Sequence, residues 1–232
     1  MNSPRFGKTI VMALGGSIMY PDKIDVGFLK NFKKFVTERL AKGNRFLIVV
    51  GGGRVARIYQ EAAHKFAKVT SEDKDWIGIH ATRTNAHLLR VLFRDVADPV
   101  VIDERYKMKA LKHKVTIASG WRPGWSTDYV AVALAADFKA GTVIIAGKPD
   151  HVYDKDPAKY KNAKVLENLS WTKYRKLIPR KWEPGAHSPV DPVASALAQK
   201  EKITAVILNG RDLKNLSMLL DGKKFNGTSI SN

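Results

Sequence analysis

Short apolar runs alternate with amphipathic segments over most of the 232 residues of this chain. The apolar runs have the length of buried strands, and they occupy residues 9–14, 46–50, 100–102, 115–118, 142–146 and 205–209. The segments between them carry apolar residues at helical spacing, and they occupy residues 26–41, 54–66, 81–96, 127–138, 192–199 and 213–220. Since a repeated strand–helix–strand order builds a parallel sheet, we predict an α/β fold with helices on both faces of that sheet.

Glycine-rich turns follow several of the predicted strands. Gly15-Gly16 follows the first strand, Gly51-Gly52-Gly53 follows the second, and Ser119-Gly120 opens a loop after the strand at 115–118. Glycine lets backbone N–H groups approach an anion without a Cβ atom in the way. Ligands of parallel sheets bind at the carboxyl ends of strands, where these turns lie. The turns therefore predict a phosphate site, and the alternative is that they are tight turns that bind nothing.

Two arginines, Arg54 and Arg57, follow the second glycine turn at the start of a predicted helix. Cations at a helix N-terminus oppose the helix dipole, so a bound anion would explain both of them. The chain has neither the Walker A spacing nor the Gly-x-Gly-x-x-Gly spacing of dinucleotide-binding proteins. The phosphate site is therefore expected to be of another kind.

Several classes of protein are not expected from the composition. The chain has no Cys, which removes disulfides and thiolate metal sites, and its 6 His form no tight ligand pair. No apolar run reaches the length of a membrane span, and the first residues lack the apolar core of a signal peptide. We expect a cytoplasmic protein without a structural metal and without a membrane partner.

The formal net charge of +18 is high for an enzyme. Such a charge occurs in nucleic-acid-binding proteins. The cations are spread along the chain, however, and no dense basic block or aromatic-interleaved RNA motif is present. The sequence therefore favours a basic enzyme that handles anions, and nucleic acid is not expected as the main partner.

A set of short segments follows in a distinctive order. They are Leu-Gly-Gly-Ser at 14–17, Val-Val-Gly-Gly-Gly-Arg-Val-Ala-Arg at 49–57, Asp-Trp-Ile-Gly-Ile-His-Ala-Thr-Arg-Thr-Asn-Ala at 75–86, Pro-Gly-Trp-Ser-Thr-Asp at 123–128, Asp-His-Val-Tyr-Asp-Lys-Asp-Pro at 150–157, Val-Asp-Pro at 190–192 and Asn-Gly-Thr at 226–228. In this order the set resembles the amino acid kinase superfamily, and the segment from Asp75 points to the archaeal-type uridylate (UMP) kinases. The resemblance runs over almost the whole chain.

This resemblance implies a three-layer αβα sandwich of one domain with a mostly parallel central sheet. Residues from about 1 to 140 would form an acceptor-binding lobe, and residues from about 141 to 232 a lobe for the nucleotide donor. The implied reaction is direct phosphoryl transfer, ATP + UMP giving ADP + UDP, with Mg²⁺ as the cofactor. The implied assembly is a homo-oligomer, either a hexamer or built from dimers.

The resemblance also assigns roles to residues. Those at the reaction centre are Gly15, Gly16 and Asp128. Those of the UMP site are Gly52, Gly53, Arg57, Asp75, Gly78, Ser119, Gly120, Trp121, Arg122, Pro123, Gly124, Trp125 and Thr127. Those of the ATP site are Gly15, Gly16, Ser17, Gly53, Arg57, Gly147, Lys148, Asp150, Tyr153 and Asp156. Gly15 and Gly16 would offer backbone amides to the transferred phosphoryl, and Asp128 would order cationic groups around it.

Some of these residues have a plain structural alternative. Asp75 would bind ribose hydroxyls, or it would cap a helix that begins at Trp76. Trp121 and Trp125 would stack on a base, or they would anchor their loop by packing. Asp128 opens a predicted helix, where a carboxylate stabilises the helix in any case.

The sequence departs from the family pattern at two lysines and at the donor motif. Ala13 and Ser188 occupy positions where many relatives carry a Lys, and a transition state with spread negative charge needs cations there. The candidate substitutes are Lys8, Arg54, Arg122 and Lys148. The donor motif reads Gly-Lys-Pro-Asp-His at 147–151. These departures leave open a kinase for another small acceptor and a molybdate- or tungstate-storage relative, and the +18 charge leaves open an oligomeric nucleotide sensor or nucleic-acid-associated scaffold.

One segment, residues 154–191, breaks the alternation because it is polar and rich in Lys. We expect it to cover the site as an irregular loop. A short helix is predicted at 170–177, with Ser170 as its N-cap.

Overall fold

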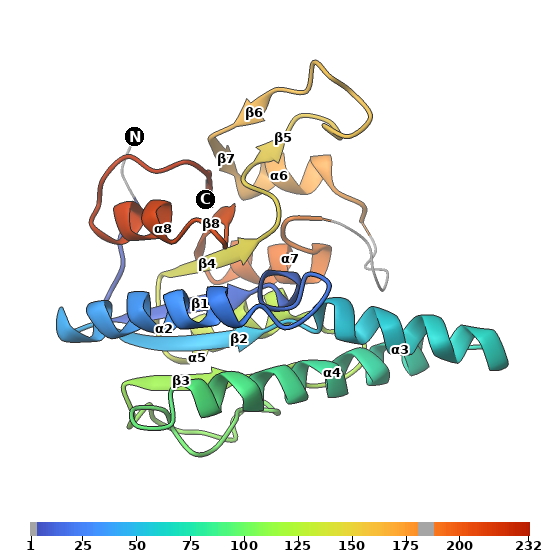
Figure 1. Cartoon of the computed structure of the whole chain (residues 1–232). Helices are drawn as coiled ribbons and strands as arrows, with labels where there is room; N and C mark the ends of the chain where they lie inside the picture. The colour runs from blue at the N-terminus through green and yellow to red at the C-terminus, as the bar shows by residue number, and fades with distance from the viewer. Residues whose placement is uncertain (1–3, 181–187) are drawn as a thin grey trace.

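One sheet organises the whole molecule. The computed structural model describes residues 4–180 and 188–232, and its main sheet has seven strands in the order β3-β2-β1-β4-β8-β9-β7 (Figure 1). Their bounds are Val115–Ala118 (β3), Arg45–Val50 (β2), Thr9–Leu14 (β1), Thr142–Gly147 (β4), Thr204–Asn209 (β8), Thr228–Ser231 (β9) and Asn168–Ser170 (β7). The pairs from β3 to β8 are parallel, and β9 is antiparallel to β8. The mostly parallel sheet is therefore confirmed.

Helices cover both faces of this sheet. One face packs against α1 (Gly16–Met19), α2 (Val26–Ala41), α4 (Ser71–Leu92) and α8 (Leu213–Leu220). The other face packs against α5 (Thr127–Asp137), α6 (Trp171–Leu177) and α7 (Pro192–Lys200). Strand β1 shows why two cores form, because Met12 points into the first core and Val11 into the second. The predicted three-layer αβα sandwich is confirmed.

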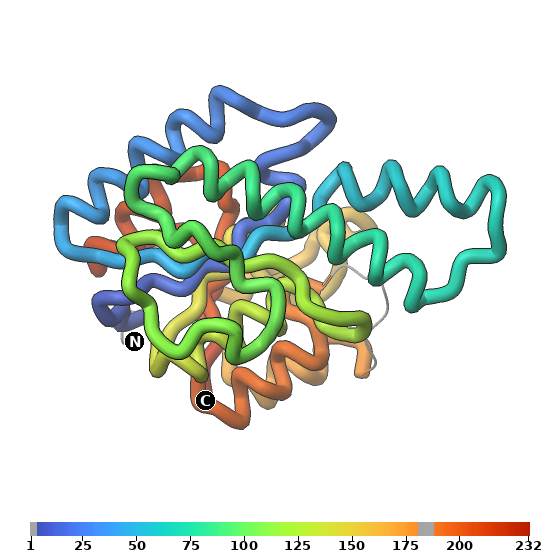
Figure 2. Tube along the Cα trace, turned by 90° about the horizontal axis from the view of Figure 1, so that it is seen from below, coloured from blue at the N-terminus to red at the C-terminus, as the bar shows by residue number. Residues whose placement is uncertain are grey.

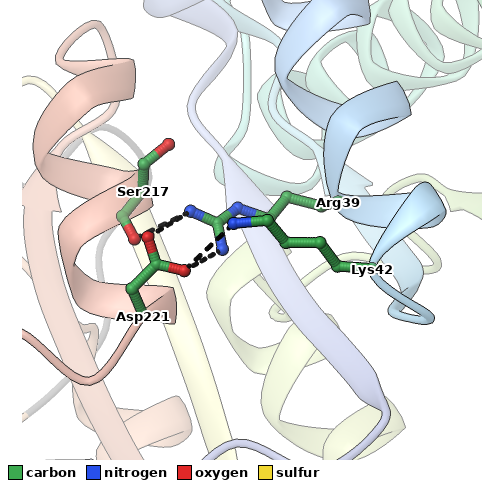
Figure 3. Close-up of polar contacts among 4 residues, drawn as sticks. All are labelled: Arg39, Lys42, Ser217 and Asp221. Atoms are coloured by element: carbon green, nitrogen blue, oxygen red, sulfur yellow. Dashed lines mark hydrogen bonds and ion pairs between the residues drawn. The ribbon is translucent and has the colours of Figure 1, made fainter.

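On the first face, an ion pair joins the end of α2 to the end of α8. Arg39, at the end of α2, donates hydrogen bonds to Asp221 Oδ1 at 2.6 Å and to the Ser217 carbonyl at 2.9 Å, and Lys42 lies 3.4 Å from the same carboxylate (Figure 3). The hydrogen bond from Arg39 is the main reason that the pKa of Asp221 falls to about 2. Helices α2 and α8 are thereby held together beside β1.

A helical hairpin projects past the edge of the sheet. It consists of α3 (Gly53–Phe66) and the first half of α4, and both views show it extending away from the body of the molecule (Figures 1 and 2). Helix α4 begins at Ser71, ten residues before the predicted start at 81, and it ends at Leu92 and not at 96. The early start is explained by a capping box, in which Thr70 and Asp73 satisfy each other's backbone N–H groups.

The strands beyond the parallel core were the weakest part of the prediction. Residues 100–102 form no strand, and Ile102 makes only an isolated bridge to Ala118. The hairpin of β5 (Val152–Tyr153) and β6 (Val165–Leu166) was not predicted, and neither were β7 and β9. These strands are two to four residues long, which is too short for alternation to reveal them.

The predicted helix at 170–177 is confirmed as α6, and Ser170 is its N-cap. The part of the predicted covering loop at 181–187 lies outside the described residues. No helix in the described parts of the chain has both the length and the apolar character needed to cross a bilayer.

Candidate active site

The first two glycine turns lie against each other at the carboxyl ends of β1 and β2. A Cβ atom on Gly16 would come within 2.3 Å of both the Gly51 carbonyl oxygen and the Gly53 nitrogen. Gly53 also has a φ of +61°, which side-chain-bearing residues rarely adopt. Only glycines permit this backbone contact. The two turns and the loop after β3, residues 15–17, 51–53 and 119–124, are called the turn cluster below.

The backbone amides of the glycine turns differ in whether they already donate a hydrogen bond within the protein. The Gly15 N–H donates to the Ala146 carbonyl at 2.9 Å, so the prediction that it is offered to a phosphoryl group is wrong. Gly16 and Gly53 are the first residues of α1 and α3, whose N–H groups have no acceptor within the helix. Both amides therefore remain available as donors at the turn cluster.

Helix α4 fixes the turn cluster from the side. Asn85 Nδ2 donates to the carbonyls of Gly51 at 2.8 Å and Gly52 at 3.1 Å. The Thr82 hydroxyl accepts from the Gly120 N–H at 2.8 Å. Both side chains are buried, so these bonds are shielded from water. Sequence analysis placed Thr82 and Asn85 in a segment typical of the UMP kinases, but it did not predict that these two side chains hold the glycine turns.

Arg57 links the turns through its side chain. It lies one turn into α3, and its Nη2 atom donates to Ser17 Oγ at 3.3 Å. The guanidinium therefore reaches back over the turn cluster, as its spacing from Gly53 predicted. Gly78, in α4, lies beside the same region, since a Cβ atom on Gly52 would come within 3.3 Å of its carbonyl.

Asp75 holds the third loop. Its Oδ2 accepts from the Gly124 N–H at 2.8 Å, and burial raises its pKa against the effect of that bond. The alternative that Asp75 caps a helix is wrong, because the helix begins at Ser71 with Thr70 as its cap. Asp75 lies on the second turn of α4 and faces the loop in which a ribose was expected.

The two tryptophans of this loop are packing residues. Trp121 is 5% exposed and belongs to the second core, so the prediction that its ring stacks on a base is wrong. Trp125 already stacks, with the Arg122 guanidinium 3.8 Å from its ring centroid and the Tyr129 ring 4.6 Å away. Arg122 is thereby held on Trp125, and neighbouring Pro123 continues the loop. The packing alternative is correct for Trp121 and describes Trp125 as well.

Asp128 lies on the wall of a cavity of about 220 Å³ between β1, β4 and α5, called the central cavity below. Its lining includes Ala13, Gly15, Thr127, Asp128, Gly147 and Ser188. Burial raises the pKa of Asp128 to about 8, and the negative charge of Asp191 adds to the effect. No ion pair in the described parts of the chain involves Asp128. The carboxyl group therefore faces the cavity without a protein cation.

Asp191 fixes the position of Asp128. It caps α7 by accepting from the N–H groups of Val193 at 2.8 Å and Ala194 at 3.0 Å, and it also accepts a hydrogen bond from Ser126. Ser126 is itself the N-cap of α5, the helix that carries Asp128. One carboxylate thus joins two helix N-termini beside the cavity. Sequence reasoning quoted Asp191 within a motif but gave it no role.

The two missing lysines correspond to this central cavity. Ala13 and Ser188 both line it, so the positions without a Lys side chain face the same space as Asp128. Lys8 is not a substitute, because it lies before the first residue of β1, at the opposite edge of the sheet. Lys148 lies nearer, in the loop directly after β4.

A larger cavity of about 540 Å³ adjoins the central one and is called the outer cavity below. Both cavities are lined by Pro149, Ser188 and Pro189. The outer cavity collects four predicted donor residues, Lys148, Asp150, Tyr153 and Asp156. The predicted donor residues Ser17, Gly53 and Arg57 lie instead in the turn cluster and on α3, on the far side of Gly15.

Tyr153 and Asp150 are paired in the outer cavity. The Tyr153 hydroxyl donates to Asp150 Oδ1 at 3.0 Å. Burial works to raise the pKa of Asp150, but this bond and the nearby His151 ring together bring it below its ordinary value. His151 is buried, and its Nδ1 atom has no hydrogen-bond partner within the described residues. It is a polar group of this cavity that sequence reasoning did not single out.

Residues 8–209 match the amino acid kinase family. The chain is 36% identical over 218 residues to the uridylate kinase of Thermococcus sibiricus, covering 92% of this chain and 96% of that protein. It is 34% identical over 227 residues to the uridylate kinase of Methanosarcina barkeri, covering 96% and 95%. The crystal structure of the uridylate kinase from Archaeoglobus fulgidus has a TM-score of 0.82 at 29% identity, covering 97% of this chain and 100% of that one.

The chain belongs to the amino acid kinase family. As a member of this family, it is a phosphotransferase. The family resemblance that we inferred from the order of its short segments is confirmed. The UMP kinases of Bacillus anthracis and Ureaplasma parvum, at 18% and 22% identity and TM-scores of 0.76 and 0.77, share its fold. Membership of the family explains why glycine turns follow successive strands in this order. A three-layer αβα fold alone does not require such turns.

Proposed function

We propose that this amino acid kinase transfers the terminal phosphoryl group of ATP directly to UMP in the cytoplasm. The observation that supports this most is the continuity of three regions at one sheet edge. The turn cluster presents amides and Arg57, the central cavity contains Asp128, and the outer cavity has room for a nucleotide. Relatives named uridylate kinase align over more than nine tenths of the chain.

In this proposal the turn cluster binds the acceptor. The amides of Gly16 and Gly53 and the guanidinium of Arg57 hold its phosphate, and Asp75 faces its ribose with the support of Gly124. Phosphoryl transfer depends on positioning and charge neutralisation more than on covalent help from the protein. A rigid cluster of glycine turns supplies such positioning.

The donor occupies the outer cavity, with its phosphates directed toward Asp128. Among the described residues, no three His, Asp or Glu side chains form a metal-binding group. Mg²⁺ that enters with ATP takes most of its ligands from phosphates and water, so a single carboxylate fits it, and Asp128 is the group that would face it. The ion supplies charge neutralisation at the phosphates. With the ion bound, Asp128 would be held in its carboxylate form, since a nearby cation lowers the pKa of a carboxyl group.

This chain lacks two lysines that many relatives carry near the transferred group. With Ala13 and Ser188 in the central cavity, cations have to come from the neighbouring regions, where Lys148 lines the adjoining outer cavity and Arg57 contacts Ser17 in the first turn. We assign the acceptor phosphate to Arg57 and the donor phosphates to Lys148. Because this chain lacks the two lysines, loss of either Arg57 or Lys148 is expected to reduce activity more than it would in a relative that has both lysines.

Self-association through α3 is part of the proposal. Of the residues in α3 only Ala56 is buried, although the helix is 14 residues long. Its apolar side chains Ile58, Tyr59 and Phe66 are 41%, 65% and 82% exposed. Exposed apolar side chains gathered on one helix mark an interface, and a second copy presents the same helix. Light scattering of Phe66→Glu beside the parent tests this, and an unchanged mass would overturn it.

A coupled ADP-release assay tests the reaction. UMP is expected to be the preferred acceptor among UMP, CMP, dUMP, AMP, GMP and acetylglutamate. A thermal-shift scan supplies an independent readout, since a ligand at 100 times its Kd adds about 2.7 kcal/mol of stability. Stabilisation by UMP without ADP release would favour a nucleotide sensor, and turnover with acetylglutamate alone would replace the assigned acceptor.

A further inference from the structure

The cations that are spread along the sequence are gathered by the fold. Strands β1, β2 and β4 point toward the side where α3 projects, so their amino ends share the opposite edge (Figure 1). Basic residues lie at this edge on five adjacent strands. Lys114, Arg45, Lys8 and Lys202 stand within two residues of the start of β3, β2, β1 and β8, Lys139 lies three residues before β4, and Arg5 lies beside the start of β4. All are exposed except Arg45, which is half-buried.

Backbone hydrogen bonds fix the order of this row. The Arg45 N–H donates to the Lys8 carbonyl at 2.8 Å, and the Phe46 N–H donates to the Lys114 carbonyl at 2.9 Å. On the other side of β1, the Thr142 hydroxyl donates to the Arg5 carbonyl at 2.7 Å. Adjacent strands lie about 4.8 Å apart, so a cation recurs at about that interval over a row of about 19 Å.

Helix dipoles explain only part of the row. Lys139 and Lys202 follow the ends of α5 and α7, where a cation is favourable in any protein. Lys8 and Lys114 directly precede strands, Arg5 lies four residues before β1, and none of the three follows a helix end among the described residues. The positive charge of this edge therefore exceeds what the helices account for.

Acidic residues do not neutralise the row. None of its cations forms an ion pair in residues 4–180 and 188–232. The acidic groups nearby are engaged elsewhere, with Asp221 bound by Arg39 and Lys42 (Figure 3) and Asp137 bound by Arg105 at 2.8 Å. Two kinds of acidic neighbour oppose the row: Glu201 is exposed between Lys200 and Lys202, and Asp98 lies at the start of β3 with its carboxylate 2.8 Å from His113 Nδ1.

An exposed aromatic ring lies in the loop that precedes β3. Tyr106 is 71% exposed, and the Arg105 guanidinium lies 4.8 Å from its ring centroid. Arg105 is bound to Asp137, two residues before Lys139, so the ring is held near the row. An aromatic ring beside a line of cations is the combination that binds a base and its phosphate backbone together.

We propose that this edge of the sheet binds single-stranded nucleic acid without sequence preference. A single line of cations fits one phosphate backbone, and Tyr106 stacks on one base. The surface lies opposite the nucleotide site, so binding there leaves the proposed phosphotransferase reaction accessible. Phosphate contacts of this kind make the affinity fall steeply with salt, by a slope of about 0.7 per contact for single strands.

The experiment measures fluorescence anisotropy of a labelled, mixed-sequence single-stranded RNA against salt concentration. The test variant carries Lys8→Gln, Lys114→Gln and Lys202→Gln; the control carries Lys30→Gln, Lys33→Gln and Lys34→Gln on the exposed side of α2, which removes the same charge. Loss of three contacts is expected to reduce the salt slope by about 2 and the affinity at least tenfold. The control variant is expected to retain the parent slope.

Other outcomes overturn the proposal. Equal losses in both variants would mean that bulk charge alone attracts RNA. Equal binding of duplex RNA that is unaffected by Tyr106→Ala would exclude the single-strand assignment. Binding to phosphatidylserine vesicles, without binding to RNA, would make the edge a membrane-surface contact. Melting temperature and ADP release of the test variant are expected to match those of the parent, which separates this proposal from the proposed function.

Discussion

The turn cluster and the outer cavity lie side by side and are built in different ways. In the turn cluster, glycine backbones touch each other, and buried Asn85 and Thr82 hold them with hydrogen bonds at 2.8 Å. In the outer cavity, side chains on a two-stranded hairpin face open space, and His151 Nδ1 lies 3.4 Å from Asp150 Oδ2 without forming a hydrogen bond. The first region is fixed by the fold itself. The shape of the second region depends on individual side chains, and its sequence at 147–151 departs from the family motif.

This difference predicts how each region responds to substitution. Changes in the turn cluster act on stability and activity together, because no atom there moves without moving a strand end. Changes in the outer cavity act on one substrate and leave the fold intact. The predictions below test that division, beginning with the largest expected effect.

Gly16→Ala is expected to be the most damaging single substitution. Its Cβ would lie 2.3 Å from the Gly51 carbonyl oxygen and the Gly53 nitrogen, and both of these are backbone atoms. Overpacking costs about 1–3 kcal/mol and more where the neighbours cannot shift. Urea denaturation measures the loss, and ADP release is expected to fall with it. Gly7→Ala is the matched control, since nothing lies within 4 Å of its Cβ; a stable, active Gly16→Ala would show that the turns do not interlock.

Asp128→Asn separates stability from turnover. We expect ADP release to fall about 100-fold or more, as for loss of a preorganised electrostatic group, while the Km for UMP changes little. Because the folded pKa of Asp128, about 8, lies above its unfolded value, the folded parent holds a proton that the unfolded chain has released. Its stability therefore decreases as pH rises from about 4 to about 8.

Asn at position 128 carries no such proton. At pH 8 the variant is expected to be more stable than the parent, with a free energy of unfolding that is higher by at least about 1.4 kcal/mol, the equivalent of one pKa unit. This advantage is expected to vanish near pH 4, and melting curves at both pH values measure it. A variant that is less stable at pH 8 and turns over normally would reduce Asp128 to a helix-stabilising carboxylate.

The sequence predicted the parts of the molecule that depend on apolar patterning and glycine. The five central strands and most helices follow from buried runs such as 46–50 and from start signals such as Ser170. The start of α4 was missed because its first turns are polar and lack an apolar stripe. Burial of Trp121 and the engagement of the Gly15 amide are tertiary facts, since each depends on a residue far away in the chain.

Arg57→Ala tests the one side chain that connects the two turns. Loss of a charge-assisted phosphate contact costs about 1.5–3 kcal/mol, which is a 10- to 150-fold rise in the Km for UMP. The fold is expected to persist, since the 3.3 Å bond to Ser17 is partly exposed. Arg54→Ala is the control on the same helix, because it removes an equal charge and Arg54, among the described residues, forms no side-chain hydrogen bond to the first turn. Equal kinetics for both variants would leave Arg57 a surface cation.

Tyr153→Phe has the smallest expected effect and the most specific one. It removes a single hydroxyl, which donates to Asp150 at 3.0 Å in the outer cavity. A hydrogen bond of this kind is worth about 0.5–1.5 kcal/mol, so the Km for ATP is expected to rise about threefold to tenfold. The Km for UMP is expected to stay unchanged, because Tyr153 lies in the outer cavity and not in the turn cluster.

The control is Tyr160→Phe, on the same hairpin and 52% exposed. Since the Tyr153 bond lowers the pKa of Asp150, its loss is expected to raise that pKa. Equal effects on both substrates would contradict the division between the two regions, because a side chain of the outer cavity would then act on the turn cluster through the fold.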